Sequence, residues 1–162
     1  MTQEATPGGK AASAAVSTPG AAPATRQEAM KQLLGGIAED LTGYQQLSAL
    51  LEQQFDAALR HQGPRLTEVA EAISALVDAM QQRRQQRVAL VQRLLGPTAT
   101  MMQAFALLKN AARERMEADW KTLEQMVIEC KRLGKRNSDL LVEQYSIMQR
   151  VLHGEEQIYA PA

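Results

Sequence analysis

The sequence predicts an all-α fold, an antiparallel bundle of three long helices and one short connecting helix with coiled-coil-like packing. Apolar residues recur at spacings of three and four over long stretches, without the alternation of a half-buried strand. Between Arg26 and Ala160 the only prolines are Pro64 and Pro97. Each follows a glycine, and the two Gly-Pro pairs mark helix boundaries. The aromatic fraction is only 4%, whereas Leu, Ala, Met and Gln are plentiful, and this composition favours helices.

Length and charge limit the possible classes of protein. A chain of 162 residues is long enough for one core and too short for two ordinary domains. Its 18 basic and 18 acidic residues give a net charge of zero, so no nucleic-acid partner is expected. No stretch is long and apolar enough for an integral membrane segment, and the N-terminus does not resemble a secretory signal. A cytoplasmic protein is expected.

The predicted organisation has three parts. Of the first 25 residues, 20 are Ala, Gly, Pro, Ser or Thr, and Val16 is their only branched aliphatic residue, so residues 1–25 are predicted to be a disordered leader. Residues 26–154 form the helical domain. Residues 155–162 follow His153-Gly154, a plausible helix stop, and are predicted to be a flexible tail.

The first two helices flank the Gly63-Pro64 pair. The first begins near Arg26 and carries one apolar stripe: Met30, Leu33, Leu34, Ile37, Leu41, Tyr44, Leu47, Leu51, Phe55 and Leu59. The second begins with Pro64 in its first turn, where a missing N–H is harmless. Its stripe is interrupted between Gln81 and Arg87, a run without a hydrophobic residue that is expected to lie in water.

The short helix and the last long helix follow Gly96-Pro97. Thr98 is the expected N-cap of the short helix, which is expected to run on or to kink near Asn110. The last helix, from residue 111 to 152, would span about 60 Å, longer than a compact domain of this size needs. Part of it is therefore expected to project, or to pair only with another long helix.

The chain offers few candidates for catalytic chemistry. It has no Glu-x-x-His pair, no phosphate-binding glycine loop and no nucleophile elbow, so no catalytic residue, metal site or cofactor is expected. Cys130 lies on an apolar stripe and is interpreted as a packed thiol rather than a nucleophile. Arg83, Arg84, Arg87 and Arg93 indicate a solvated face more than a phosphate site. Trp120 is interpreted as a core anchor, with an exposed interface anchor as the alternative.

The C-terminal end of the last helix carries a broad apolar face. Its members are Asn137, Leu140, Leu141, Gln144, Ile147, Met148 and Val151. If the first two helices do not reach this end, the face is open and an amphipathic segment of another protein could dock there. The alternative is that it completes the bundle core or a homodimer seam, and the pattern alone leaves both open.

The same region resembles the FlgN family of flagellar export chaperones. The resemblance is carried by Leu133, Asn137, Leu140-Leu141, Glu143-Gln144 and the final Ile158-Tyr159. The upstream segment Leu50-Leu51-Glu52-Gln53-Gln54 and the Gln- and Arg-rich second helix agree with that family's plan. The resemblance spans residues 28–159.

The resemblance implies a non-enzymatic chaperone, cytoplasmic and transiently at the inner-membrane export apparatus. It would bind the C-terminal helical segments of the hook-filament junction proteins, the first and third hook-associated proteins, and prevent premature assembly. It would then deliver them to the flagellar type III export gate, with the export ATPase as a further candidate partner. The apolar face would bind the client, and Tyr159 would contact the gate. The alternative function is a structural coiled-coil adaptor or self-assembling bundle in which the same face forms a homodimer.

Overall fold

The computed structural model describes residues 25–159, so all but Thr25 of the expected leader, and residues 160–162 of the expected tail, lie outside the described residues. Four helices follow in order: α1 (Arg26–Leu59), α2 (Gly63–Leu95), α3 (Met101–Phe105) and α4 (Asn110–Tyr159). The described part contains no strand. The predicted all-α bundle of three long helices and one short helix is confirmed.

The helix boundaries follow from local capping and turn chemistry. Thr25 caps α1 by accepting a hydrogen bond from the N–H of Glu28 at 3.1 Å. α2 begins at Gly63-Pro64, as predicted from the missing N–H of proline. The N-cap of α3 is Thr100, not the predicted Thr98, because Thr100 forms a reciprocal capping box with Gln103.

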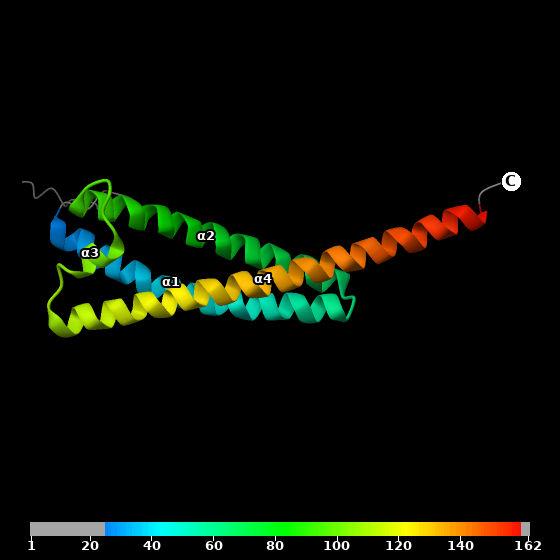
Figure 1. The fold of residues 1–162 in the computed structure, drawn as a ribbon, viewed down its shortest axis with the longest axis horizontal. Coiled ribbons are helices and arrows are strands. Elements are labelled where there is room, and N and C mark those ends of the chain that lie inside the picture. Colours follow the sequence, from blue (N-terminus) through cyan, green and yellow to red (C-terminus); the bar gives the residue numbers. More distant parts are fainter. Residues whose placement is uncertain (1–24, 160–162) are drawn as a thin grey trace, which may run out of the picture.

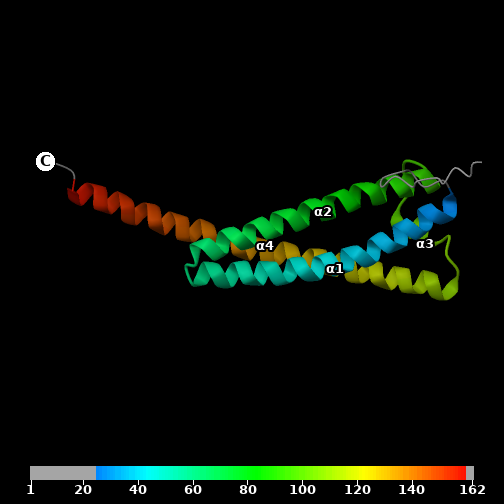
Figure 2. The ribbon, with the colours of Figure 1, turned by 180° about the vertical axis from the view of Figure 1, so that it is seen from behind.

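The long helices α1 and α4 run in the same direction and α2 runs in the opposite direction (Figure 1). Helix α1 is the one that contacts both of the other long helices. α1 packs against α2 on one side and against α4 on the other. Among the described residues, no Cα atom of α2 lies within 8 Å of a Cα atom of α4. The short helix α3 lies in the connection between α2 and α4, at one end of the bundle (Figure 2). It contacts α2 and α4.

The core is a narrow seam with two centres. Near α3, the buried residues are Ala29, Leu33, Leu90, Val91 and Ala104. In the middle of the bundle, they are Leu47, Leu51, Met80, Cys130 and Leu133. Apolar residues at about one position per turn leave this narrow seam rather than a thick globular core.

α4 is longer than the helices against which it packs. Its 50 residues correspond to about 75 Å at 1.5 Å per residue. It passes Gly134 without a break, and its last part projects beyond the turn between α1 and α2 (Figure 1). The predicted projection is confirmed. The predicted stop at His153-Gly154 is wrong, because Gly154 costs only about 1 kcal/mol within a helix and α4 continues through it to Tyr159.

None of the helices within residues 25–159 has a stretch long and apolar enough to cross a membrane.

Candidate functional site

The predicted apolar face of α4 forms one continuous stripe that starts inside the bundle and ends outside it. Successive residues of a helix are about 100° apart, so residues three, four and seven positions apart share a face. Its members are Asn137, Leu140, Leu141, Gln144, Ile147, Met148 and Val151. Asn137 is buried, Leu140, Leu141 and Gln144 are half-buried, and the last three members are exposed, so the stripe divides into an anchored part and an exposed part.

Asn137 begins the anchored part and is only 2% exposed. Its amide nitrogen donates to the backbone carbonyl of Leu51 at 2.7 Å and to Oε1 of Gln54 at 2.9 Å. Its amide oxygen accepts from the neighbouring Arg136 at 3.1 and 3.2 Å. Asn137 is thus fully hydrogen-bonded between α4 and α1, and a partner protein cannot touch it while these two helices stay packed.

Arg136 secures the same junction from the side. Its guanidinium lies 3.8 Å from the ring centroid of Phe55, close enough for a cation–π contact. The same group reaches Oε1 of Glu52 at 3.3 Å. One turn beyond Leu140 and Leu141, which are half-buried, Gln144 donates to the carbonyl of Ala58 at 2.9 Å. Among the described residues this is the last hydrogen bond from α4 to another helix.

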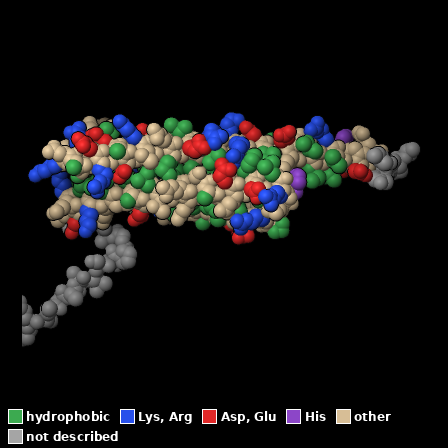
Figure 3. Space-filling view, turned by 90° about the horizontal axis from the view of Figure 1, so that it is seen from below, with side chains coloured by type: hydrophobic (Ala, Val, Ile, Leu, Met, Phe, Trp, Pro, Cys, Tyr) green, Lys and Arg blue, Asp and Glu red, His purple; other side chains and the backbone are tan. Residues whose placement is uncertain are grey.

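The exposed part of the stripe begins after Gln144. Ile147 is 46% exposed, Met148 58% and Val151 56%. They continue the face that packs on α1, but α1 ends at Leu59 and α2 begins at Gly63, so neither helix extends alongside them. This end of the predicted face, which the sequence could not assign to core or surface, is therefore exposed in the structure. Figure 3 shows hydrophobic side chains reaching along the projecting end of the molecule.

The exposed stripe has the properties of a helix-docking surface. Branched and unbranched apolar side chains spaced by three and four residues present a ridge that another amphipathic helix can pack against. The flexible Met148 adds adaptability to different partner side chains. Tyr159, the predicted gate contact, is the last residue of α4, and its side chain lies outside the described residues.

A buried ionic centre sets the register of α1 and α2. Asp40 is 2% exposed and accepts a hydrogen bond from Nε of Arg83 at 2.8 Å and another from Nη1 of Arg87. The guanidinium of Arg87 also stands 5.5 Å from the Trp120 ring of α4, which forms a T-shaped contact with the Phe105 ring of α3. The expectation that this arginine run lies in water is therefore wrong for Arg83 and Arg87.

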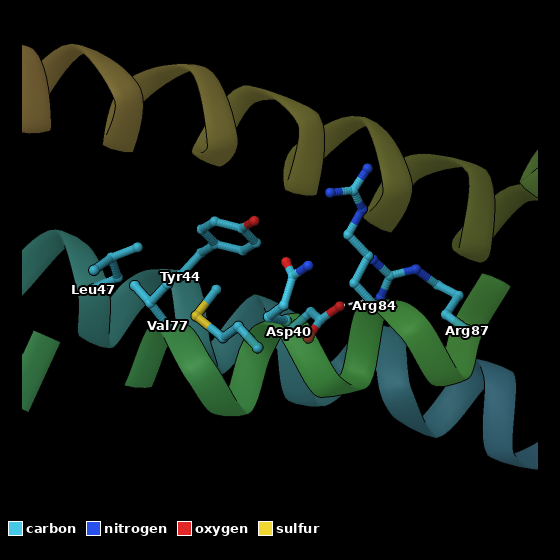
Figure 4. A pocket seen from close by; sticks show the side chains of 8 residues that line it. Asp40, Tyr44, Leu47, Val77, Arg84 and Arg87 are labelled. Atoms are coloured by element: carbon cyan, nitrogen blue, oxygen red, sulfur yellow. Dashed lines mark hydrogen bonds and ion pairs between the residues drawn. The ribbon is translucent and has the colours of Figure 1, made fainter. Parts of the chain in front are cut away.

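Arg84 is the exception in this run because it is exposed and forms no hydrogen bond or ion pair with another described residue. A hollow of about 180 Å³ lies beside it, lined by α1 and α2. Figure 4 shows Tyr44, Leu47 and Val77 at one end of the hollow and Arg84 near the other. Sequence analysis missed this hollow, because its lining comes from two helices whose register only the folded structure reveals.

Cys130 is buried in the central core, as the sequence predicts for a packed thiol. Its Sγ lies 3.7 Å from the carbonyl oxygen of Tyr44. Burial raises the pKa of this thiol above its ordinary value, and the neighbouring charge of Glu129 raises it further. A raised pKa makes the thiol a poor nucleophile at neutral pH. Within residues 25–159, no three His, Cys, Asp or Glu side chains gather as a metal site.

Comparison with known proteins adds one finding to this geometry. A family model described as FlgN protein matches residues 30–154 of the chain, which include most of the bundle and all of the exposed stripe. The match confirms the resemblance seen in the sequence. No curated protein and no solved structure matches the chain.

Proposed function

Because the chain belongs to the FlgN family of flagellar export chaperones, we propose that it is a cytoplasmic chaperone for the hook-filament junction proteins. In this proposal it binds the C-terminal helical segments of the first and third hook-associated proteins. While bound, those segments cannot assemble prematurely. The chaperone then brings its client to the flagellar export gate, where Tyr159 makes the contact and the export ATPase is a further candidate partner.

The single observation that supports this mechanism best is the exposure of Ile147, Met148 and Val151 at the projecting end of α4. An apolar stripe of a helix gains stability when another apolar surface removes it from water, at roughly 25 cal/mol per Å². A client segment that would otherwise polymerise through its own amphipathic stripe offers such a surface. Binding through a few side chains on one helix face remains reversible, which delivery requires.

The anchored part of the stripe serves the exposed part by holding α4 in place. Asn137 and Gln144 tie α4 to backbone carbonyls of α1. Leu140 and Leu141 are half-buried beside them and form the inner edge of the proposed client site. The start of the projecting segment is therefore tied to the bundle, while its outer apolar side chains stay available to the client.

The proposal is tested by titration calorimetry with peptides that span the C-terminal segments of the two junction proteins. Met148→Asp places a carboxylate in the centre of the stripe and should weaken binding at least about tenfold, because a buried unpaired charge opposes docking. Gln149→Asp is the matched control, since the adjacent residue is exposed on another face of α4. If both variants bind the peptides with the same affinity, and circular dichroism shows an unchanged helix content, the proposed site is contradicted.

The gate contact is tested separately. Tyr159→Ala should leave the affinity for both peptides unchanged and reduce export of the junction proteins from cells. An equal loss of peptide affinity and export would contradict a separate gate contact.

A further inference from the structure

We propose that the end of the bundle at which α3 lies binds the surface of an anionic lipid bilayer. The contact is made by a group of apolar and basic side chains that we call the basic end patch. Its members are Arg26, Met30, Lys31, Leu34, Leu107 and Lys109. This inference concerns the end of the molecule opposite to the exposed stripe of α4, and it does not depend on the proposed chaperone function.

The centre of the basic end patch is apolar. Leu107, which follows α3, is 44% exposed. It lines a shallow groove of about 760 Å³ together with Met30 and Leu34 of α1, which are half-buried. Aliphatic side chains of this kind can enter the interfacial region of a bilayer, and removing them from water contributes roughly 25 cal/mol per Å².

Basic side chains surround this apolar centre. Arg26 and Lys31 line the same groove, and Lys109 follows Leu107 by two residues. All three basic side chains are exposed, and none of them forms an ion pair with another described residue. Among the described residues that line the groove there is no Asp or Glu. The positive charges of the patch are therefore available to the phosphate groups of anionic lipids.

The charge of the chain is unevenly distributed, although its net charge is zero. Residues 26–31 and 93–115, which form this end of the bundle, contain six basic residues and two acidic ones. The connection from residue 96 to 110 contains no acidic residue. Figure 3 shows several Lys and Arg side chains at this end of the molecule. Clusters of about four to eight basic residues beside an apolar surface are typical of anionic-lipid binding.

The shape of the basic end patch favours a bilayer over a docked helix. A groove that binds an amphipathic helix needs anchors spaced over two turns or more. The two apolar residues that α1 contributes, Met30 and Leu34, are one turn apart, and α3 has only five residues. The patch is therefore short, and it lies at one end of an elongated molecule, where it can reach a flat surface (Figure 1).

Lipid binding at this end leaves the projecting end of α4 free. The two ends lie far apart along the bundle, as Figures 1 and 2 show. A chain that rests on a bilayer through the basic end patch would therefore keep the exposed stripe away from the lipid. If the exposed stripe also binds clients, as proposed above, one chain can hold a bilayer and a client at the same time.

Flotation of the full chain with lipid vesicles tests the proposal. The chain should float with vesicles of phosphatidylglycerol and phosphatidylcholine in equal parts, but not with vesicles of phosphatidylcholine alone. High salt should release the chain, because it screens exposed charges. Lys31→Glu reverses one charge of the patch and should weaken binding at least about fivefold. Leu107→Gln removes an apolar side chain at constant charge and should weaken binding at least about threefold.

Matched controls separate the basic end patch from the net charge and the other exposed apolar residues. Lys131→Glu makes the same change in net charge in the middle of α4, and Ile128→Gln removes an apolar side chain that is 68% exposed. Both variants should bind the anionic vesicles as the wild type does. Met148→Asp should also bind them unchanged, because the exposed stripe lies at the other end of the molecule. All substituted side chains are exposed, so circular dichroism should show an unchanged helix content in every variant.

Five results would overturn the proposal. The first is a wild-type chain that does not bind anionic vesicles even at low salt. The second is an equal loss of binding in Lys31→Glu and Lys131→Glu, which would assign the binding to net charge. The third is wild-type binding by Leu107→Gln, and the fourth is a loss of binding in Met148→Asp, which would move the contact to the exposed stripe. The fifth is tighter binding to soluble polyglutamate than to the vesicles, which would indicate an acidic protein as the partner.

Discussion

Replacing Asp40 by alanine removes the buried carboxylate that Arg83 and Arg87 share between α1 and α2. In the variant, both guanidinium groups keep their positive charge without the opposite charge that compensates their burial. Removing one partner of a buried ion pair typically costs about 3–5 kcal/mol, because the remaining charge is left uncompensated. The Arg83 and Arg87 side chains are 22% and 14% exposed, so water can partly rehydrate them, which favours the lower limit of about 3 kcal/mol.

Such a loss is large compared with the usual stability of a single domain. At roughly 4 °C per kcal/mol for a domain of this size, Tm should fall by about 12 °C in Asp40→Ala. Urea unfolding followed by far-UV circular dichroism measures the change in free energy of unfolding directly.

Glu39→Ala is the control for a general effect of charge removal. Glu39 is 68% exposed and lies 4.0 Å from Arg83, so its loss should change the free energy of unfolding by at most about 0.5 kcal/mol. An Asp40→Ala variant that loses less than about 1 kcal/mol would refute the assignment of Asp40 as the residue that compensates the two arginines.

Three further predictions concern stability. The free energy of unfolding should decline as pH rises above about 9, because burial raises the pKa of Cys130 above 9.0 and of Tyr44 above 10.0 in the folded chain, so that the unfolded chain releases these protons first. Cys130→Ser and Tyr44→Phe should each reduce this decline in urea titrations at a series of pH values; an unchanged pH profile in both variants would exclude these groups as its cause. Gly134→Ala should stabilise the chain by about 0.5–1 kcal/mol, because nothing lies within 4 Å of the added Cβ. Gly43→Ala should stabilise it less, because its added Cβ would lie 2.9 Å from the Arg83 side chain. Equal gains in Tm for the two variants would contradict the close approach of α1 and α2. Asn137→Ala should cost about 1–3 kcal/mol through its lost hydrogen bonds, and a cost below about 0.5 kcal/mol in urea unfolding would show that Asn137 does not anchor α4.

Much of the fold was accessible from the sequence because its signals are local. Gly63-Pro64 and Gly96-Pro97 punctuate the chain where α1, α2 and α3 end or begin, and spacings of three and four residues identify the long helices. The end of α4 was predicted wrongly because a glycine ends a helix only where the chain turns, and the chain does not turn at Gly154. The N-cap of α3 was misplaced because two threonines stand two residues apart and only one closes a capping box.

The contacts that cross between helices were less accessible. Asp40 stands among apolar positions of α1, and its partners Arg83 and Arg87 lie 43 and 47 residues away, so their pairing depends on the register of two helices. Asn137 shares a face with Met148, and sequence alone could not show that Asn137 faces a backbone carbonyl of α1 whereas Met148 is exposed. Periodicity identifies a face of a helix, whereas the lengths of neighbouring helices decide which part of that face is covered.

Amide hydrogen exchange of the full chain, with and without a junction-protein peptide, locates the client directly. Beyond Gln144, α4 forms no described hydrogen bond to another helix, so its amides should exchange quickly in the free chain. Peptide binding should slow amide exchange over residues 145–159 and leave exchange in most of α1 and α2 unchanged. Slower exchange confined to α1 and α2, with residues 145–159 unaffected, would contradict the assignment of the exposed stripe as the client site.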